Sequence, residues 1–210
     1  TDQPFRSLEL SATGPVIVPS TGLGKFAYGI TLVDGFVQDD ILALGKALID
    51  GTQTSAQGAA VSSFAVSKTF AEILGSSLDE EARYVLWVVA DVELLSKEFG
   101  QITAKISSSK SYLLDADISV EVRGAEAVYM GVVENVEGAK TEILELVQTA
   151  ALRPVRVTDQ LFVYEGKATE FTSTEGYENG MRYAAEYLVW VIPAVSGDYT
   201  YTEEDIFSHV

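Results

Sequence analysis

The stretches YVLWVVADV (residues 84–92) and YAAEYLVWVI (residues 183–192) decide the fold of this chain. Both are rich in β-branched and aromatic residues, which pack well on the pleated surface of a sheet. In the first stretch Leu86 and Val89 also fit the spacing of a helix, but the composition favours a strand. Each stretch is shorter than the roughly 18 apolar residues of a membrane-spanning helix. We therefore expect two buried strands and no association with a membrane.

Two helices are predicted beside these strands. Asp39 and Asp40 open the first, with their carboxylates near its positive end, and Gly51 ends it. Residues 137–152 (EGAKTEILELVQTAAL) form the second, which Pro154 stops. In both helices apolar residues recur on one face, which is typical of helices that cover a sheet.

Shorter signals occupy much of the remaining chain. Capping boxes at 69–72 and 77–80 predict two further helix starts. Alternating or apolar runs predict strands, and an Asn-Gly pair predicts a hairpin turn; these lie at 25–33, 102–107, 118–123, 127–133 and 179–180. No internal repeat stands out in the sequence.

Together these elements predict an α/β (α+β) fold, a mainly antiparallel β-sheet flanked by two main helices. We expect a single α+β domain at residues 20–196, with a β-hairpin insertion at about 100–135. Two extended arms flank it, an N-terminal arm at 1–19 and an acidic, aromatic C-terminal arm at 197–210. A chain of this length buries roughly 70% of its unfolded surface, so it folds without disulfides.

The chain offers little for catalysis. It contains no cysteine, and its one histidine, His209, lies beside the C-terminus, where chains are usually mobile. Nucleophile–base catalysis needs an imidazole at a fixed distance from the nucleophile. The net charge of −17 argues against nucleic acid as a bound partner, because phosphate binding depends on clustered Lys and Arg. We predict a protein that is not an enzyme and has no catalytic residue and no cofactor.

Two motifs approach ligand-binding patterns and depart from them in detail. Residues 21–25 (TGLGK) are followed by Phe26, where a phosphate loop needs Ser or Thr, so we expect an ordinary glycine turn. Residues 115–126 place acidic and hydroxyl side chains at calcium-loop spacing, but Val120 stands where that loop needs glycine. We expect the polar face of a strand there, and no metal site.

The two terminal arms carry the candidate contact residues. Aromatic residues are enriched at protein interfaces, and the acidic segment around the last ones makes them poor candidates for a core. A terminal arm that packs on a neighbouring subunit explains both features, whereas Trp190 is expected in the sheet core. The predicted subunit-interface residues are Tyr199, Tyr201, Ile206 and Phe207 in the C-terminal arm and Leu8 and Leu10 in the N-terminal arm.

The order of elements in the C-terminal half supports a comparison with a known family. The helix at 137–152 runs into a proline-led strand (RPVRVTDQLFVYEG, 153–166), then a polar hairpin, then a long apolar strand (MRYAAEYLVWVIPAV, 181–195). With DDIL at 39–42 and the strand at 84–92, this order resembles the tail terminator (tail completion) proteins of long-tailed, especially contractile-tailed, bacteriophages.

The resemblance implies a sheet flanked by two helices, in a hexameric ring that caps the tail tube and meets the head connector. It implies no catalytic residue. The partners it implies are further copies of this chain and other virion tail and neck proteins, and DNA passes through without specific binding. It places the protein in the virion tail or neck, assembled in the host cytoplasm. The N-terminal arm and the long segment at 100–135 depart from the family.

Other functions remain open. A tail tube or another neck protein fits the same resemblance. From a different class, a calcium-dependent carbohydrate-binding domain or a carboxylate-based hydrolase is the main alternative, because paired carboxylates can catalyse glycoside or peptide hydrolysis. Among 31 acidic residues, however, adjacent carboxylates are expected by chance. A surface adhesion module of a salt-loving microbe is a third, because such a habitat also favours an acidic chain.

Overall fold

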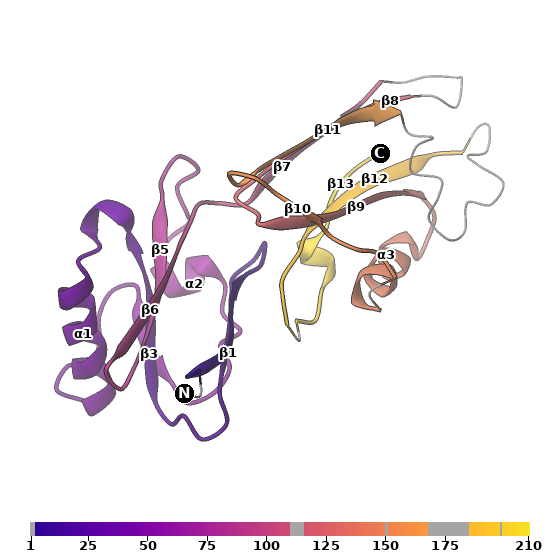
Figure 1. Cartoon of the computed structure of the whole chain (residues 1–210). Coiled ribbons are helices and arrows are strands. Elements are labelled where there is room, and N and C mark those ends of the chain that lie inside the picture. The colour runs from indigo at the N-terminus through magenta and orange to yellow at the C-terminus, as the bar shows by residue number, and fades with distance from the viewer. Residues whose placement is uncertain (1–2, 110–115, 150, 168–184, 198) are drawn as a thin grey trace. The chain divides into compact units, whose positions relative to one another are not determined.

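A computed structural model describes residues 3–109, 116–149, 151–167, 185–197 and 199–210. The fold is α+β with mainly antiparallel sheets, as the sequence predicted. The chain divides into two compact units, residues 1–101 and 102–210, each with its own sheet and helices (Figure 1). The sequence predicted instead one domain at 20–196 with arms and an insertion. Each unit is described separately below.

The first unit is built on a four-stranded antiparallel sheet in the order β4-β3-β5-β6. Its strands are β3 (Phe26–Leu32), β4 (Ala59–Ser62), β5 (Tyr84–Ala90) and β6 (Glu93–Phe99). Every residue of β5 is buried, which confirms the strand predicted there. It lies between β3 and β6, so both of its backbone edges are paired.

Helix α1 (Gln38–Asp50) covers one face of this sheet, and it confirms the first predicted helix. Ile41 and Leu48 pack against Trp87 and Val89 of β5. The helix approaches the sheet closely at Gly45, where a Cβ would lie within 2.6 Å of side-chain atoms of Val89. A larger residue at this position would therefore push the helix away from the sheet.

The opposite face carries a hairpin and a short helix. Strands β1 (Phe5–Leu10) and β2 (Pro15–Pro19) pair antiparallel, and α2 (Phe70–Leu74) begins at the predicted capping box. A 3-10 turn, η1 (Val33–Gly35), follows β3. The second predicted box, at 77–80, does not start a helix. Asp79 caps a turn there instead, and its N–H donates to the Tyr84 hydroxyl at 2.9 Å, because the chain must enter β5.

The second unit contains two antiparallel sheets. The first, in the order β11-β8-β7, consists of β7 (Thr103–Ser108), β8 (Asp117–Arg123) and β11 (Leu161–Lys167). The second, in the order β10-β9-β12-β13, consists of β9 (Ala127–Glu134), β10 (Val155–Arg156), β12 (Tyr187–Pro193) and β13 (Phe207–His209).

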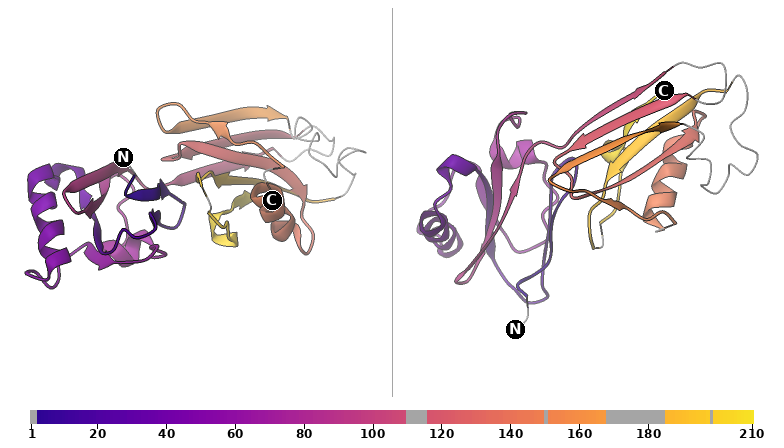
Figure 2. Two further views of the ribbon diagram at one scale, coloured as in Figure 1. Left: turned by 60° about the horizontal axis from the view of Figure 1, so that its bottom comes forward. Right: turned by 45° about the horizontal axis from the view of Figure 1, so that its top comes forward.

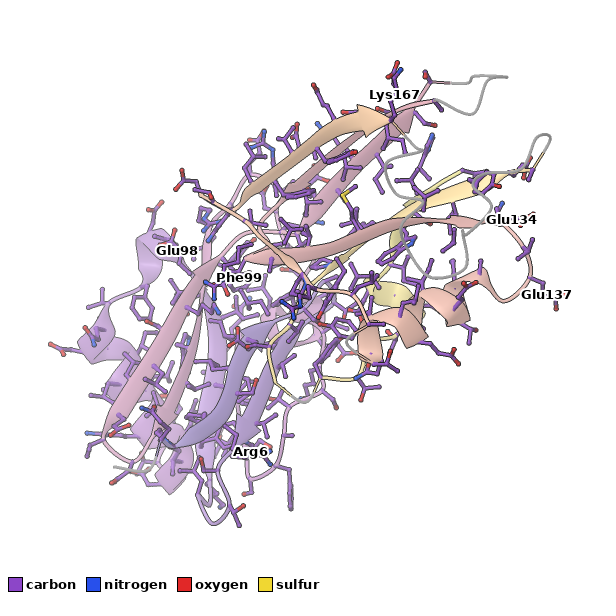
Figure 3. All side chains as sticks on the ribbon, turned by 45° about the vertical axis from the view of Figure 1, so that its right-hand side comes forward. Arg6, Glu98, Phe99, Glu134, Glu137 and Lys167 are labelled. Atoms are coloured by element: carbon purple, nitrogen blue, oxygen red, sulfur yellow. The ribbon has the colours of Figure 1, made fainter. Side chains whose placement is uncertain are left out.

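These two sheets form a sandwich, and α3 (Ala139–Gln148) covers the outer face of the second sheet, giving three layers (Figure 2). Val120 and Val122 of β8 pack against Val189 and Val191 of β12 in the apolar core between the sheets. Side chains fill the space between them (Figure 3). Trp190 points to the opposite side of β12 and is fully buried, as predicted.

The predicted boundaries differ from these units for a physical reason. Residues 103–123 are not an insertion, because β8 supplies fully buried valines to the core of the second unit. The N-terminal segment is a hairpin on the core of the first unit rather than a free arm. The predicted turn at 179–180 and residues 110–115, between the predicted strands at 102–107 and 118–123, lie outside the described residues.

Candidate assembly surfaces

The C-terminal segment packs on its own unit. Tyr201 is only 8% exposed, and its hydroxyl accepts from the Val195 N–H at 2.8 Å and donates to the Val195 carbonyl at 3.1 Å. Its ring meets Tyr129 and Tyr199 edge-on, at 6.0 and 4.9 Å between centroids. Burial raises the pKa of Tyr201 to about 12. This residue is therefore part of the core of the second unit.

Asp205 anchors the same segment from the 3-10 turn η3 (Glu203–Asp205) and is 1% exposed. Its carboxylate accepts from the Tyr199 hydroxyl at 3.0 Å and from the Thr202 N–H at 2.9 Å. Burial raises the pKa of this carboxyl, and the hydrogen bonds from Thr202 and Tyr199 only partly oppose that rise. A buried acid with such bonds fixes the conformation of the turn.

The side chain of Gln148, in the last turn of α3, joins the helix to this segment. Its Nε2 donates to the Tyr199 carbonyl at 3.0 Å, and its Oε1 accepts from the Tyr201 N–H at 3.0 Å. The side-chain amide of Gln148 thus satisfies the Tyr199 carbonyl and the Tyr201 N–H, two backbone groups in a segment without regular secondary structure. The segment is held by α3 as well as by β12.

The predicted C-terminal contact residues therefore lie differently from expectation. Tyr201 is buried within its own unit, while Tyr199, Ile206 and Phe207 are half-buried and leave part of their surface exposed. Phe207 begins β13, which pairs antiparallel with β12 at the edge of the sheet. His209 lies exposed in the same strand. The acidic composition was misleading because the acids at 203 and 204 point to solvent while Asp205 is buried.

The two predicted N-terminal contact residues lie in β1. Leu8 and Leu10 are partly buried and pack against the core of the first unit. Beside them, Glu9 accepts from Lys97 of β6 at 3.0 Å in a partly buried ion pair. The β1–β2 hairpin thus buries much of its apolar surface against the core of its own unit.

Among the described residues, some exposed large apolar side chains lie in or just after the outermost strands β4, β10 and β11, while Leu32, Val37, Val92, Val136 and Val210 lie elsewhere. Phe64 is 80% exposed just after β4, and the Ser62 side chain holds its turn by bonding both backbone groups of Phe64 at 3.1 and 2.9 Å. Val61 lies in β4 itself, and the other members are Val155 in β10 and Leu161 and Val163 in β11. β4, β10 and β11 each form one side of their sheet. We call these five residues the apolar edges.

Sequence reasoning missed the apolar edges. Phe64 stands alone in the polar stretch SSFAVSK, outside any predicted element, and this isolation was the available signal. An aromatic residue without a periodic partner has no obvious place in a core. Val163 was assigned to a strand, but its face could not be assigned without the partner sheet.

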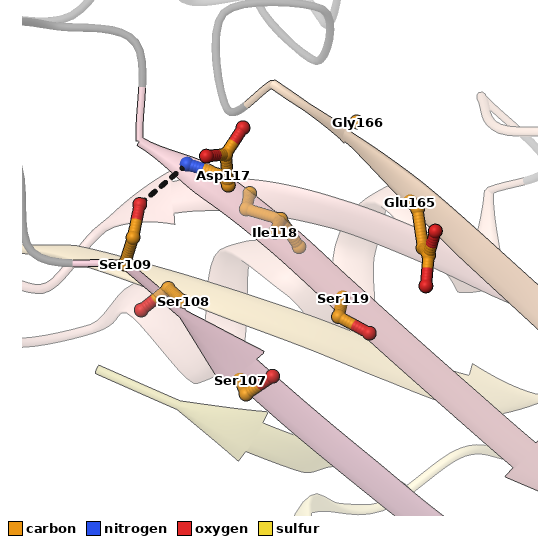
Figure 4. Close-up of a pocket in the computed structure, with 8 residues that line it drawn as sticks. All are labelled: Ser107, Ser108, Ser109, Asp117, Ile118, Ser119, Glu165 and Gly166. Atoms are coloured by element: carbon orange, nitrogen blue, oxygen red, sulfur yellow. Dashed lines mark hydrogen bonds between the residues drawn. The ribbon is translucent and has the colours of Figure 1, made fainter.

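A polar groove of about 300 Å³ lies at one end of the β7–β8–β11 sheet (Figure 4). Ser107, Ser119 and Glu165 stand opposite one another across the three strands. At the strand ends, the Asp117 N–H donates to Ser109 Oγ at 2.9 Å, and its carboxylate pairs with Lys167. The groove offers hydroxyl and carboxylate groups for a polar ligand and has no imidazole among its lining residues.

Within residues 115–126, which have calcium-loop spacing, Asp117–Arg123 form strand β8. A strand was predicted there because Val120 stands where a calcium loop needs glycine. Ile118, Val120 and Val122 face the core, and the intervening polar side chains face outward. Successive side chains of a strand point to opposite faces, so this segment does not form the sharply turned loop of a calcium site. In the part of the chain that is described, no three His, Cys, Asp or Glu side chains are grouped to hold a metal.

The fold and these surfaces define a two-unit α+β protein with apolar strand edges. No protein-family model, no curated protein and no solved structure matches the chain. Among the described residues, no helix is both long enough and apolar enough to cross a membrane.

Proposed function

We propose that the protein is a structural subunit of a virion, which forms a ring at the junction of tail and neck. In this role it caps the tail tube and joins the tail to the head. The observation that carries the proposal is the set of apolar edges, which suits a subunit whose strand edges are covered by neighbours. The resemblance in element order then suggests which assembly this is.

The apolar edges support assembly for a physical reason. An outermost strand has unpaired backbone groups, and proteins that remain single usually protect them with charge, proline or a covering loop. Here Val61, Val155 and Val163 offer apolar side chains on such strands, and Phe64 adds an exposed ring. Burying about 100 Å² of apolar surface contributes roughly 2.5 kcal/mol, so a few such contacts favour association.

The charge of the chain supports a passage for DNA. The formal net charge is −17, and a ring of such subunits repels phosphate. Repulsion lets DNA pass without being held, whereas a basic lining would bind it. On this proposal the partners are copies of this chain and other tail and neck proteins, and no cofactor is involved.

Negative-stain electron microscopy of the purified protein tests this function. We expect closed rings with a central opening, and we expect the rings to bind the ends of tail tubes when the two are mixed. Particles of single-chain size at micromolar concentration would contradict the proposal. Rings that stack into long tubes on their own would favour the alternative of a tail tube protein.

A carbohydrate-binding function is the second candidate, because the serine-rich groove at the end of the β7–β8–β11 sheet offers hydroxyl and carboxylate groups. Binding of glycans on an array, lost on adding a calcium chelator, supports the calcium-dependent form. Binding that survives the chelator supports a calcium-independent site. Glycan binding lost in Glu165→Gln would locate the site in the groove.

A further inference from the structure

The two units share one order of strands and α-helices along the chain, apart from α2, which occurs only in the first, and β11, which occurs only in the second. In each, a hairpin comes first (β1–β2 or β7–β8), followed by a strand (β3 or β9) and a helix (α1 or α3). An outer strand, a central strand and a second outer strand complete each four-stranded sheet. The spatial orders, β4-β3-β5-β6 and β10-β9-β12-β13, are the same when the strands are matched in chain order.

The register of the two central strand pairs is also the same. Gly29 stands opposite Trp87 in the first sheet, and Gly131 stands opposite Trp190 in the second. At the ends of these ladders Tyr84 and Tyr187 occupy matching places, opposite Leu32 and Glu134. Because a one-residue slip would reverse the faces of a strand, matched register means that matched side chains face the same way.

Both glycines are covered by the tryptophan across from them. A Cβ on Gly29 would lie 2.4 Å from Trp87 Cζ2, and a Cβ on Gly131 would lie 2.8 Å from Trp190 Cζ2. Each tryptophan points to the helix side of its sheet, away from the side on which the hairpin packs. The two units therefore share a specific packing detail as well as an order of strands.

In helices α1 and α3, matching positions lie at the same distance in sequence from the glycine under the tryptophan. The same number of residues separates Gly29 from Ile41 and Gly131 from Ile143, and both isoleucines are buried. The helix sequences then read ILAL at 41–44 and ILEL at 143–146. The central strands read YVLWVVA at 84–90 and YLVWVIP at 187–193, with Tyr, Trp and the following Val in common.

We infer that the chain is a tandem duplication, in which two diverged copies of one unit follow each other. Chance could supply a common strand order, but it would not also match the register, the glycine under the tryptophan and the helix positions. The sequence alone hid the repeat, because the identical residues are few and different segments lie between them in the two copies.

One divergence between the copies has a measurable consequence. Trp87 Nε1 donates to Thr31 Oγ1 at 3.1 Å, whereas Trp190 Nε1 is buried without a partner in the described part of the chain. The residue that matches Thr31 is Val133, which stands opposite Leu188 as Thr31 stands opposite Val85. The second copy thus lacks the hydroxyl that satisfies the indole of the first.

A second divergence explains the C-terminal segment. In the first copy, Asp91 and Val92 alone join the central strand β5 to the outer strand β6. In the second copy, residues 194–206 make the corresponding connection between β12 and β13, and they include Tyr201 and Asp205. The acidic segment is therefore an enlarged strand connection of the second copy.

The duplication changes the expected composition of the ring, and this consequence rests on the proposed function. A chain with two copies of one unit supplies two equivalent positions. A ring with six unit positions then contains three chains, where an unduplicated subunit would need six. A ring of six chains would overturn this consequence while leaving both the ring and the duplication intact.

Exchanging the divergent residue tests the duplication in the full chain. In Val133→Thr, we expect the Trp190 indole N–H to gain a partner, to shift in a ¹H–¹⁵N spectrum and to exchange with solvent about fivefold more slowly. In Thr31→Val, we expect the Trp87 indole N–H to lose its partner and to exchange about fivefold faster. Val132→Thr is the matched control, because Val132 faces the core between the two sheets.

The control variant should leave the Trp190 indole resonance in place. If Val133→Thr shifts that resonance no more than Val132→Thr does, the two positions are not equivalent and the inference is overturned. An unchanged exchange rate of the Trp87 indole in Thr31→Val would overturn it as well, even if the Val133 variant failed to fold.

Discussion

The Tyr201 hydroxyl is bonded to both backbone groups of Val195, accepting from the N–H at 2.8 Å and donating to the carbonyl at 3.1 Å. One side chain thereby satisfies both the N–H and the carbonyl of Val195, just after the chain leaves β12. Val195 is itself 8% exposed, so water has little access to these groups. The pair explains why an acidic, irregular segment packs on its own unit.

Tyr201→Phe keeps the ring contacts and removes both hydrogen bonds. We expect the free energy of unfolding to fall by about 1–3 kcal/mol, because the Val195 N–H is left buried and unsatisfied. Urea denaturation of both proteins measures the difference. A change within 0.5 kcal/mol would mean that water replaces the hydroxyl and that the pair contributes little.

The same variant provides the control for a pH measurement. The folded-state pKa of Tyr201 is raised from 10.0 to about 12, so the ionised form is disfavoured in the fold. The stability of the wild type relative to Tyr201→Phe should be full below pH 10 and should fall as the pH rises toward 12. A relative stability that stays constant over this range would contradict the burial of the hydroxyl.

Asp205 should give a pH dependence at the acidic end. Burial raises its folded-state pKa above the ordinary value of 3.8, so the folded protein holds this proton more tightly than the unfolded chain. Stability relative to Asp205→Asn should be greatest below pH 3.8 and should be lost as the pH rises through the raised pKa. If relative stability instead increases with pH, the hydrogen bonds from Tyr199 and Thr202 outweigh the burial.

The glycines under the two tryptophans should both resist substitution. We expect Gly29→Ala and Gly131→Ala each to lower the free energy of unfolding by about 1–3 kcal/mol, because the new methyl group overlaps the indole. The loss should be larger for Gly29→Ala, because its methyl group would also lie 2.6 Å from the backbone carbonyl oxygen of Gly58. Gly35→Ala is the control, since its Cβ would meet only an ordinary contact at 3.7 Å. A tolerated Gly131→Ala would show that the second unit packs less tightly than the first.

Phe64 should matter for assembly and not for folding. Its side chain is 80% exposed, so we expect Phe64→Ser to change the free energy of unfolding by less than about 0.5 kcal/mol. If Phe64 contacts a neighbour, the midpoint concentration for assembly should rise about tenfold in analytical ultracentrifugation, an effect of roughly 1.4 kcal/mol. Val92→Ser, at the exposed β5–β6 turn, is the control.

Local patterns predicted the regular elements well. The composition of residues 84–90 identified β5, and Gly51 marked the end of α1, where it adopts a positive φ of 81°. The second helix was predicted at 137–152 but begins only at Ala139, because Gly138 also has a positive φ, and it ends at Gln148. These strands and helix ends depend on residues that are close together in the chain, so local sequence patterns can predict them.

Long-range contacts were harder to predict. The capping pattern at 77–80 predicted a helix start, but Asp79 caps a turn there because the buried strand that follows fixes the path of the chain. The burial of Tyr201 depends on Val195 and Gln148, which no local pattern connects to it. The division into two units was missed because it depends on which strands pair and pack together, and these lie far apart in the sequence.

Counting the chains in the assembled particle tests the central claim most directly. Native mass spectrometry of the wild-type protein, at concentrations where rings are seen by microscopy, gives this number from the mass of 22.6 kDa per chain. We predict a closed particle of three chains that supplies six unit positions. A closed particle of six chains would contradict the three-chain count, and a protein that remains a single chain at every concentration would contradict the proposed ring.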